Sequence, residues 1–233
     1  MDIVVAREVL RNLVKGAQKV GYYSGKNPEM VKMLGKMPPY FKNSDGSIKE
    51  WAYEGLDDFN YHQHLSHLYP VFPGTEVSTR KNRELQPGLQ LAVQKRVLGS
   101  QKGWGMAHMS CLYCRLGQQE KATECLDILT RSCLLSNFLR PITTGAGWVL
   151  PWIWEGFTTI QLDALMGLVN AVQEILLYAD ERYIKIPPSR PECFMAGKIS
   201  SFCFPGGSVS LQWAVGFAVR RRMSGISAQR RAI

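Results

Sequence analysis

Apolar residues recur three and four positions apart over most of this chain, and that spacing predicts a mainly helical fold. Glycine follows several of the periodic segments, at the position where a left-handed residue commonly ends a helix. Gly117 leaves only a few residues between two such segments, which is typical of an antiparallel helical hairpin. The segments expected to be helical are 2–20, 27–34, 82–98, 103–116, 119–135 and 161–178. In the last of them we expect an inward face made of Leu162, Leu165, Met166, Val169, Val172, Ile175 and Leu176.

The helical spacing ends near Lys185, where prolines precede two short runs of alternating residues. The runs 199–204 and 209–213 flank a Pro-Gly-Gly turn and are predicted to be paired strands. We therefore expect a helical domain over residues 1–184 and the start of a β module over residues 185–213. Residues 214–233 are rich in arginine and lack clear alternation, so we expect a disordered basic tail there.

Composition excludes several classes of protein. With 233 residues, 45% of them hydrophobic and 20% charged, the chain can bury a sizeable core. The net charge of +9 suggests nucleic-acid binding, but five of those charges lie in the arginine-rich tail, so we expect no nucleic-acid partner. No apolar run approaches the roughly 18 to 20 residues that span a bilayer, so we expect no membrane partner. The N-terminal segment lacks a secretory signal pattern, and we expect a cytoplasmic chain with reduced cysteines.

The densest group of chemically active side chains lies in residues 48–74, which read IKEWAYEGLDDFNYHQHLSHLYPVFPG. Aromatic rings stack on the apolar faces of pyranose sugars, while carboxylates and imidazoles bind the sugar hydroxyls. The pattern is therefore compatible with structural histidines, with a carbohydrate site, or with a metal site formed by His62, His64 and His67. In an extended segment His62 and His64 share one face and His67 lies on the other, which counts against the metal site.

Three motifs, in the same order along the chain, resemble glycoside hydrolase family 95. The string HQHLSHLYPVFPG resembles the family's histidine signature, and it follows a Glu-Trp pair, here Glu50 and Trp51. The string GWGMAHMSCLYCRLGQQEKA resembles the family's Gly-Trp helix, which ends in an Arg-Leu-Gly turn. The string IQLDALMG resembles the segment that carries an acidic residue of the family, matching Asp163. The resemblance covers about residues 30–213, and these residues resemble the C-terminal part of the family's catalytic domain.

This resemblance implies a fold and an activity. The fold is a partial (α/α)6 toroid of helical hairpins, followed by a short β segment from a C-terminal β-sandwich-like module. The activity is inverting exo-hydrolysis of terminal α-L-fucosyl or α-L-galactosyl residues on an oligosaccharide or glycan, without a cofactor or a metal. In the family a Glu is the general acid, and an Asn pair helped by an Asp positions the attacking water. Asp163 matches that catalytic Asp, but nothing here matches the acid or the Asn pair, so we expect this chain alone to be an inactive fragment.

The same resemblance implies a set of substrate-binding residues. Gln63 stands where the family usually has Arg, which removes a charged, forked donor. His108 lies on the apolar stripe of its helix, where a hydrogen-bonded core histidine is the alternative. Asp163 lies near a helix start, where helix capping is the alternative. The candidates are His64, Gln63, His62, His67, Glu50, Trp51 and His108.

Two further functions stay open at this point. The chain could be a non-catalytic sugar-binding remnant, or it could be a metal-binding module built on the histidines of residues 62–67. An incomplete toroid would also leave apolar helix faces uncovered, so we expect association through exposed helix faces.

Overall fold

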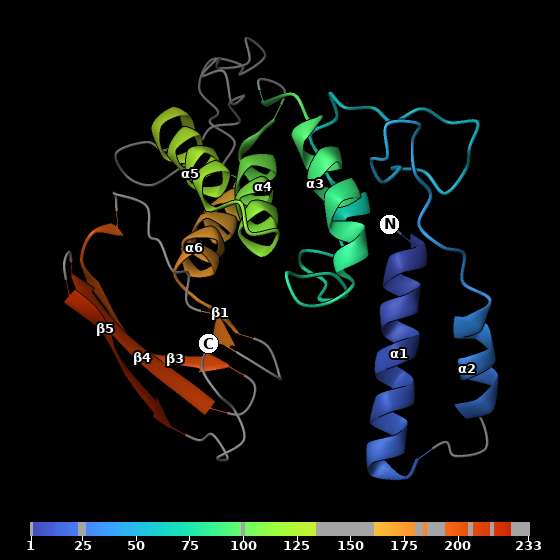
Figure 1. Ribbon diagram of the computed structural model, residues 1–233, viewed down its shortest axis with the longest axis horizontal. Helices are drawn as coiled ribbons and strands as arrows, with labels where there is room; N and C mark the ends of the chain where they lie inside the picture. Colours follow the sequence, from blue (N-terminus) through green and yellow to red (C-terminus); the bar gives the residue numbers. More distant parts are fainter. Residues whose placement is uncertain are drawn as a thin grey trace.

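The computed structural model describes residues 2–22, 27–98, 101–133, 161–179, 184–185, 194–204, 207–214 and 217–224. Its helices are α1 (Asp2–Val20), α2 (Asn27–Gly35), α3 (Gln86–Gln94), α4 (Gly103–Arg115), α5 (Gln119–Cys133) and α6 (Leu162–Leu176), with 3-10 turns η1 (Ser66–Leu68) and η2 (Arg83–Leu85). Figure 1 shows α1 and α2 at one end, α3 in the middle, and α4, α5 and α6 together beside the strands. The mainly helical prediction is confirmed over these residues, while the partial (α/α)6 toroid stays a prediction.

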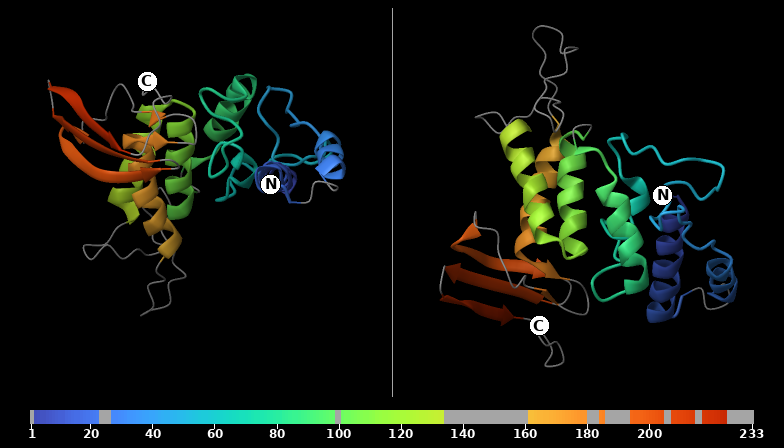
Figure 2. Two further views of the ribbon diagram at one scale, coloured as in Figure 1. Left: turned by 90° about the horizontal axis from the view of Figure 1, so that it is seen from below. Right: turned by 45° about the horizontal axis from the view of Figure 1, so that its top comes forward.

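Helix α4 is the centre of the core, because nearly every side chain from Gly103 to Cys114 is buried. It packs against α5 and α6, and Figure 2 shows the three helices side by side between the strands and α3. Gly117 has a φ of +81° between α4 and α5, so the hairpin expected there is confirmed. On α6, Gly167 allows the closest approach to α4, since a Cβ at that position would lie 2.7 Å from the Cβ of Ala107.

The buried face of α6 differs from the expected one. Leu162, Met166 and Val169 were expected to face inward, but they are between 62% and 66% exposed. Small residues face α4 instead, because a close approach of two helix backbones leaves no room for bulky side chains at the contact. The buried residues of α6 are Ala164, Gly167, Ala171, Glu174, Ile175 and Leu176, of which only the last two were expected. Association through the exposed face of α6 stays a prediction.

Helix α3 is shorter than the segment 82–98 that was expected to form it. The 3-10 turn η2 occupies the first part, and α3 begins at Gln86 with Pro87 in its first turn. Residues 40–79 contain no α-helix, as expected from their irregular sequence, and their regular structure is limited to η1 and a bridge between Lys42 and Ile48. In the part of the chain that the structure describes, no helix combines the length and the apolarity needed to cross a bilayer.

Two antiparallel sheets follow α6. Strands β1 (Tyr178–Ala179) and β2 (Ile184–Lys185) form a short pair, and β3 (Gly197–Phe204), β4 (Gly207–Ala214) and β5 (Phe217–Ser224) form a sheet in the order β3-β4-β5. The change to β-structure near Lys185 and the pairing of the two predicted strands are confirmed. A second apolar cluster lies between this region and the end of α6, and it contains Leu177, Phe204, Val209, Leu211 and Trp213.

The expectation of a disordered tail from residue 214 is wrong for residues 217–224. They form β5, which pairs with β4 from Ser208↔Ser224 to Ala214↔Phe217. The three consecutive arginines interrupt the alternation of apolar and polar residues. The apolar residues Phe217, Val219 and Met223 are nevertheless two and four positions apart, as a strand requires. Pairing uses backbone groups, and charged residues are well tolerated on an edge strand such as β5. Residues 225–233 lie outside the described residues.

Candidate active site

A buried arginine holds the irregular loop that carries the candidate residues. Arg96, which follows α3, has a side chain that is 1% exposed and donates from Nη1 to the carbonyl oxygen of Phe59 at 2.7 Å. Its Nη2 donates to Oε2 of Glu50 at 3.0 Å. The backbone N–H of Glu50 in turn donates to Asp58 at 2.7 Å. The Arg96 guanidinium therefore ties residues 50–60 to the end of α3, and the N–H of Val97 adds a hydrogen bond to the carbonyl oxygen of Asn60 at 3.3 Å.

His62, Gln63 and His64 lie against the start of α4. The rings of His62 and His64 have centroids 5.3 Å apart, and the backbone N–H of His64 donates to Nδ1 of His62 at 3.1 Å. Gln101 donates from Nε2 to the carbonyl oxygen of His62 at 3.2 Å. A Cβ on Gly105 would lie 3.0 Å from the carbonyl oxygen of Gln63, so the absence of a side chain there allows the segment to approach α4.

Asp163 lies in the first turn of α6, and its charge acts on His64. Burial lowers the pKa of His64, His62 and Lys102 lower it further, and the negative charge of Asp163 opposes them. The charge of Asp163 therefore reaches His64 in the folded chain, although the two residues are far apart in the sequence. Asp163 is exposed, and its Oδ1 accepts a hydrogen bond from the N–H of Ala164 at 2.8 Å, so a helix-end contact accompanies any catalytic role.

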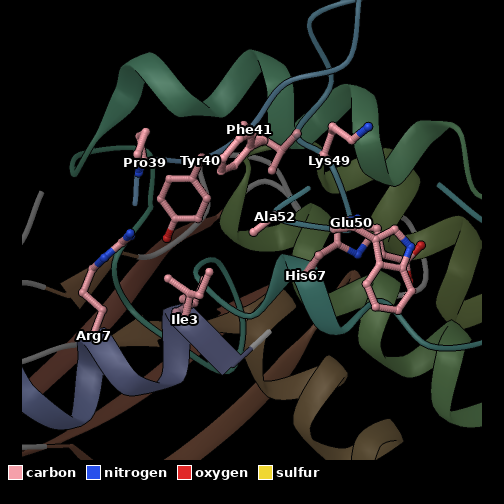
Figure 3. A pocket seen from close by; sticks show the side chains of 12 residues that line it. Ile3, Arg7, Pro39, Tyr40, Phe41, Lys49, Glu50, Ala52 and His67 are labelled. Carbon is pink, nitrogen blue, oxygen red and sulfur yellow. The ribbon is translucent and has the colours of Figure 1, made fainter. Parts of the chain in front are cut away.

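Glu50, Trp51 and His67 lie at a different place. They line a small cavity of about 50 Å³ whose opposite wall comes from α1 and the segment after α2. Figure 3 shows Glu50 and His67 on one side of this cavity and Arg7 and Tyr40 on the other. The expected substrate-binding residues are therefore divided among a group around His64, a group at this cavity, and His108, which lies apart on α4.

His67 lies in the 3-10 turn η1 and not in an extended segment, and it does not share the exposed surface of His62 and His64. Its side chain is buried, with Nδ1 3.3 Å from Nη2 of Arg96. Burial, followed by the charge of Arg96, lowers the pKa of His67 to about 3, so the ring is neutral near pH 7. Over the described ranges no group of three His, Cys, Asp or Glu side chains could hold a metal ion. The alternative of a metal module built on His62, His64 and His67 is therefore wrong, because the third histidine belongs to the core.

His108 is a buried, hydrogen-bonded histidine of α4. Its Nε2 donates to the carbonyl oxygen of Phe72 at 3.0 Å, and its ring stacks on Trp104 with centroids 5.4 Å apart. With Nε2 as the donor, Nδ1 is an acceptor, and it has no hydrogen-bond partner among the residues that the structure describes. Burial lowers the pKa of His108, while the bond to Phe72 opposes this. These contacts match the core alternative, and a role in substrate binding stays a prediction.

Comparison with known proteins decides the family. The model of the "Glycosyl hydrolase family 95 catalytic domain" matches residues 1–176. The chain belongs to glycosyl hydrolase family 95. Among curated proteins it is similar to "Alpha-L-fucosidase 2" of Arabidopsis thaliana, with 28% identity over 223 residues, which cover 93% of this chain and 25% of that protein. It is also similar to "Probable alpha-fucosidase A" of Aspergillus oryzae, with 25% identity over 214 residues that cover 81% of this chain and 28% of the relative. The chain spans about a quarter of the length of these relatives.

Several residues of this family 95 chain that shape the site were not recognised from the sequence. Arg96 and Gln101 bind the loop through backbone carbonyl groups, which leaves no motif to recognise. Lys102 lies just before α4, and its charge lowers the pKa of His64. Trp104 was noted only as part of the Gly-Trp motif, yet its ring packs against both His108 and the backbone at Gly167. The Gly-Trp-Gly string was the one available signal, because glycine on both sides of a tryptophan indicates close backbone packing.

Proposed function

We propose that this family 95 chain is part of a glycoside hydrolase that removes a terminal α-L-fucosyl residue, or the related α-L-galactosyl residue, from an oligosaccharide with inversion. The names of the curated relatives, an alpha-L-fucosidase and a probable alpha-fucosidase, support L-fucose as the sugar. The observation that supports the proposal is that the charge of Asp163, at the acidic helix start, acts on His64 of the histidine motif. Asp163 and His64 are proposed to have different roles, one in catalysis and the other in sugar binding.

Inverting hydrolysis requires one group that protonates the leaving oxygen and a second that activates water on the opposite face of the sugar. An amide is a weak base, but a carboxylate that accepts its N–H increases the electron density on the amide oxygen. We assign this supporting role to Asp163. The amide pair and the general acid are proposed to lie outside the residues of this chain, so that this chain alone does not cleave the substrate.

His64 is proposed to bind the terminal sugar. Because its pKa is lowered, the imidazole is neutral near pH 7 and offers one N–H donor and one acceptor nitrogen. Sugar hydroxyls both donate and accept, so a neutral imidazole suits them better than an imidazolium, which only donates. His62 and Gln63 are the next candidates, since the Gln63 Nε2 lies 3.4 Å from the His64 Nε2.

The test is a titration of the purified chain with L-fucose, followed by calorimetry and by the NMR signals of the imidazole protons. We expect binding that His64→Ala abolishes and that Asp163→Asn weakens. Asp127→Asn is the control, because Asp127 is an exposed carboxylate on α5 whose partner is Arg131. L-fucose binding that is equal in the chain and in both site variants would contradict the proposal.

A hydrolysis assay with a fucosylated oligosaccharide separates catalysis from binding. We expect no release of L-fucose from this chain alone, and release by this chain alone would show that the acid and the water-positioning groups are present after all. Binding without release, even when the chain is joined to the remaining length of a family 95 enzyme, would favour the non-catalytic sugar-binding alternative.

A further inference from the structure

The irregular loop carries a row of exposed rings that ends at His64. Phe59 is 58% exposed and Tyr61 is 64% exposed, and both histidines that follow are also exposed. The ring centroids are 6.2 Å apart between Tyr61 and Phe59, 6.2 Å between Phe59 and His62, and 5.3 Å between His62 and His64. We call these four residues the ring track. The track ends at His64, on which the charge of Asp163 acts.

The backbone under the ring track is held in place. The N–H of Phe59 donates to Oε2 of Glu50 at 3.3 Å, and its carbonyl oxygen accepts from Arg96 at 2.7 Å. One ion pair between Glu50 and Arg96 therefore fixes both polar groups of the Phe59 backbone. The N–H of His62 also donates to the carbonyl oxygen of Phe59 at 3.0 Å, which closes the turn between them. A large exposed ring on a fixed backbone loses little freedom when a ligand binds.

The geometry points to Phe59 and Tyr61 of the ring track as the rings that bind the sugar units next to the cleaved terminal residue, which itself lies at the His62 and His64 end of the track; this inference rests on the proposed function. A pyranose has an apolar face and a rim of hydroxyls, and each ring of the track likewise combines an apolar face with polar groups nearby. Successive rings are tilted by 45° to 55°, so they form steps instead of one flat apolar patch. The apolar faces of a chain of linked sugars can stack on successive rings of such steps.

The experiment compares two ligands on the full chain by calorimetry. One is L-fucose, and the other is the trisaccharide in which L-fucose is linked to the galactose of lactose. We expect the trisaccharide to bind about tenfold more tightly, since one additional ring contact is worth about 1.4 kcal/mol at most. Phe59→Ala and Tyr61→Ala should bring the ratio of the two affinities close to one.

Tyr53→Ala is the matched control. Tyr53 is in the same loop and is 64% exposed, the same fraction as Tyr61, but it is not part of the ring track. This variant should keep the affinity ratio of the parent chain. Thermal unfolding of each variant checks that it folds, and an exposed ring can be removed with little loss of stability.

The possible outcomes separate the ring track from the proposed function. If the ratio is unchanged in Phe59→Ala and Tyr61→Ala while His64→Ala abolishes L-fucose binding, the ring track is wrong and the proposed function stands. If neither ligand binds, both are overturned. If only the trisaccharide binds, and Phe59→Ala abolishes that binding, the ring track is supported and the role of His64 is contradicted. A dimer in sedimentation that Phe59→Ala dissociates would show that a second copy covers the rings, which also overturns the inference.

Discussion

Two of the buried arginine–carboxylate pairs in the described residues, Arg115–Glu174 and Arg96–Glu50, differ in what they connect. Arg115 on α4 binds Glu174 on α6 through two hydrogen bonds of 3.1 Å and 2.7 Å, with side chains that are 11% and 7% exposed. Its Nη1 also donates to the carbonyl oxygens of Val71 and Gly74, and its guanidinium lies 4.8 Å from the ring centre of Phe72. This pair joins elements that are all part of the core.

The pair between Arg96 and Glu50 joins the core to an exposed loop instead. Arg96 makes a single contact with Glu50, and its Nε has no hydrogen-bond partner within the described part of the chain. Beside it lies the neutral ring of His67. Arg115 thus joins buried elements through four hydrogen bonds, whereas Arg96 joins the buried core to the exposed backbone at Phe59, beside the candidate binding residues.

Glu174→Gln should have the largest effect. It leaves the buried charge of Arg115 without a counter-charge, and breaking a buried pair typically costs about 3–5 kcal/mol. Urea unfolding of the parent chain and the variant measures the loss. Asp127→Asn is the control, because the pair between Asp127 and Arg131 is exposed and should contribute no more than about 1 kcal/mol. Equal losses in the two variants would contradict a difference between buried and exposed pairs.

This core pair was not visible in the sequence, whereas other parts of the fold were. The helix ends at Gly21 and Gly117 were predictable because a positive φ favours glycine, and both residues have one. The inward face of α6 was not predictable, because hydrophobicity selects large residues while the contact with α4 selects small ones such as Gly167. Local spacing carries information about the helix itself and little about which neighbour it meets.

The candidate site divides in the same way. The histidine motif and Asp163 were recognised as separate strings, and only the family resemblance implied that they belong together. Arg96 could not be recognised, since its function depends on contacts with Phe59 and Glu50 that are many positions away. Long-range contacts through backbone carbonyl groups leave no side-chain pattern in the sequence. The contacts by which Arg96 supports the loop are therefore seen only in the folded chain.

Arg96→Met should have an intermediate effect. Hydrogen bonds to charged groups contribute about 1.5–3 kcal/mol, and the loss should be at the lower end because water can reach Glu50, whose side chain is 15% exposed. The released loop should be cut by chymotrypsin after Phe59 or Tyr61, which limited proteolysis with mass spectrometry detects. Lys95→Met is the control, since this neighbour forms a more exposed pair with Asp45. A variant with normal stability and an intact loop would show that Arg96 is not the anchor.

A small decrease in pH should have the smallest of these effects. It should lower the free energy of unfolding through His67, which lies beside Arg96. The pKa of His67 falls from 6.5 to about 3 in the folded chain, so below about pH 6.5 the unfolded chain binds a proton that the folded chain does not. Stability is therefore fully present above that pH and is lost as the pH falls toward 3, by about 1 kcal/mol between about pH 6.5 and pH 5.5. His67→Asn removes this titration, so urea unfolding should show a weaker pH dependence in the variant. Equal pH dependence would mean that the ring is protonated in the folded chain. Arg96 and an imidazolium would then lie side by side, and the Arg96 site would need another negative charge nearby.

The Arg115–Glu174 pair should show no such pH dependence. The Glu174 contact holds the pKa of Arg115 above its usual value against the effect of burial, so Arg115 keeps its proton throughout this range.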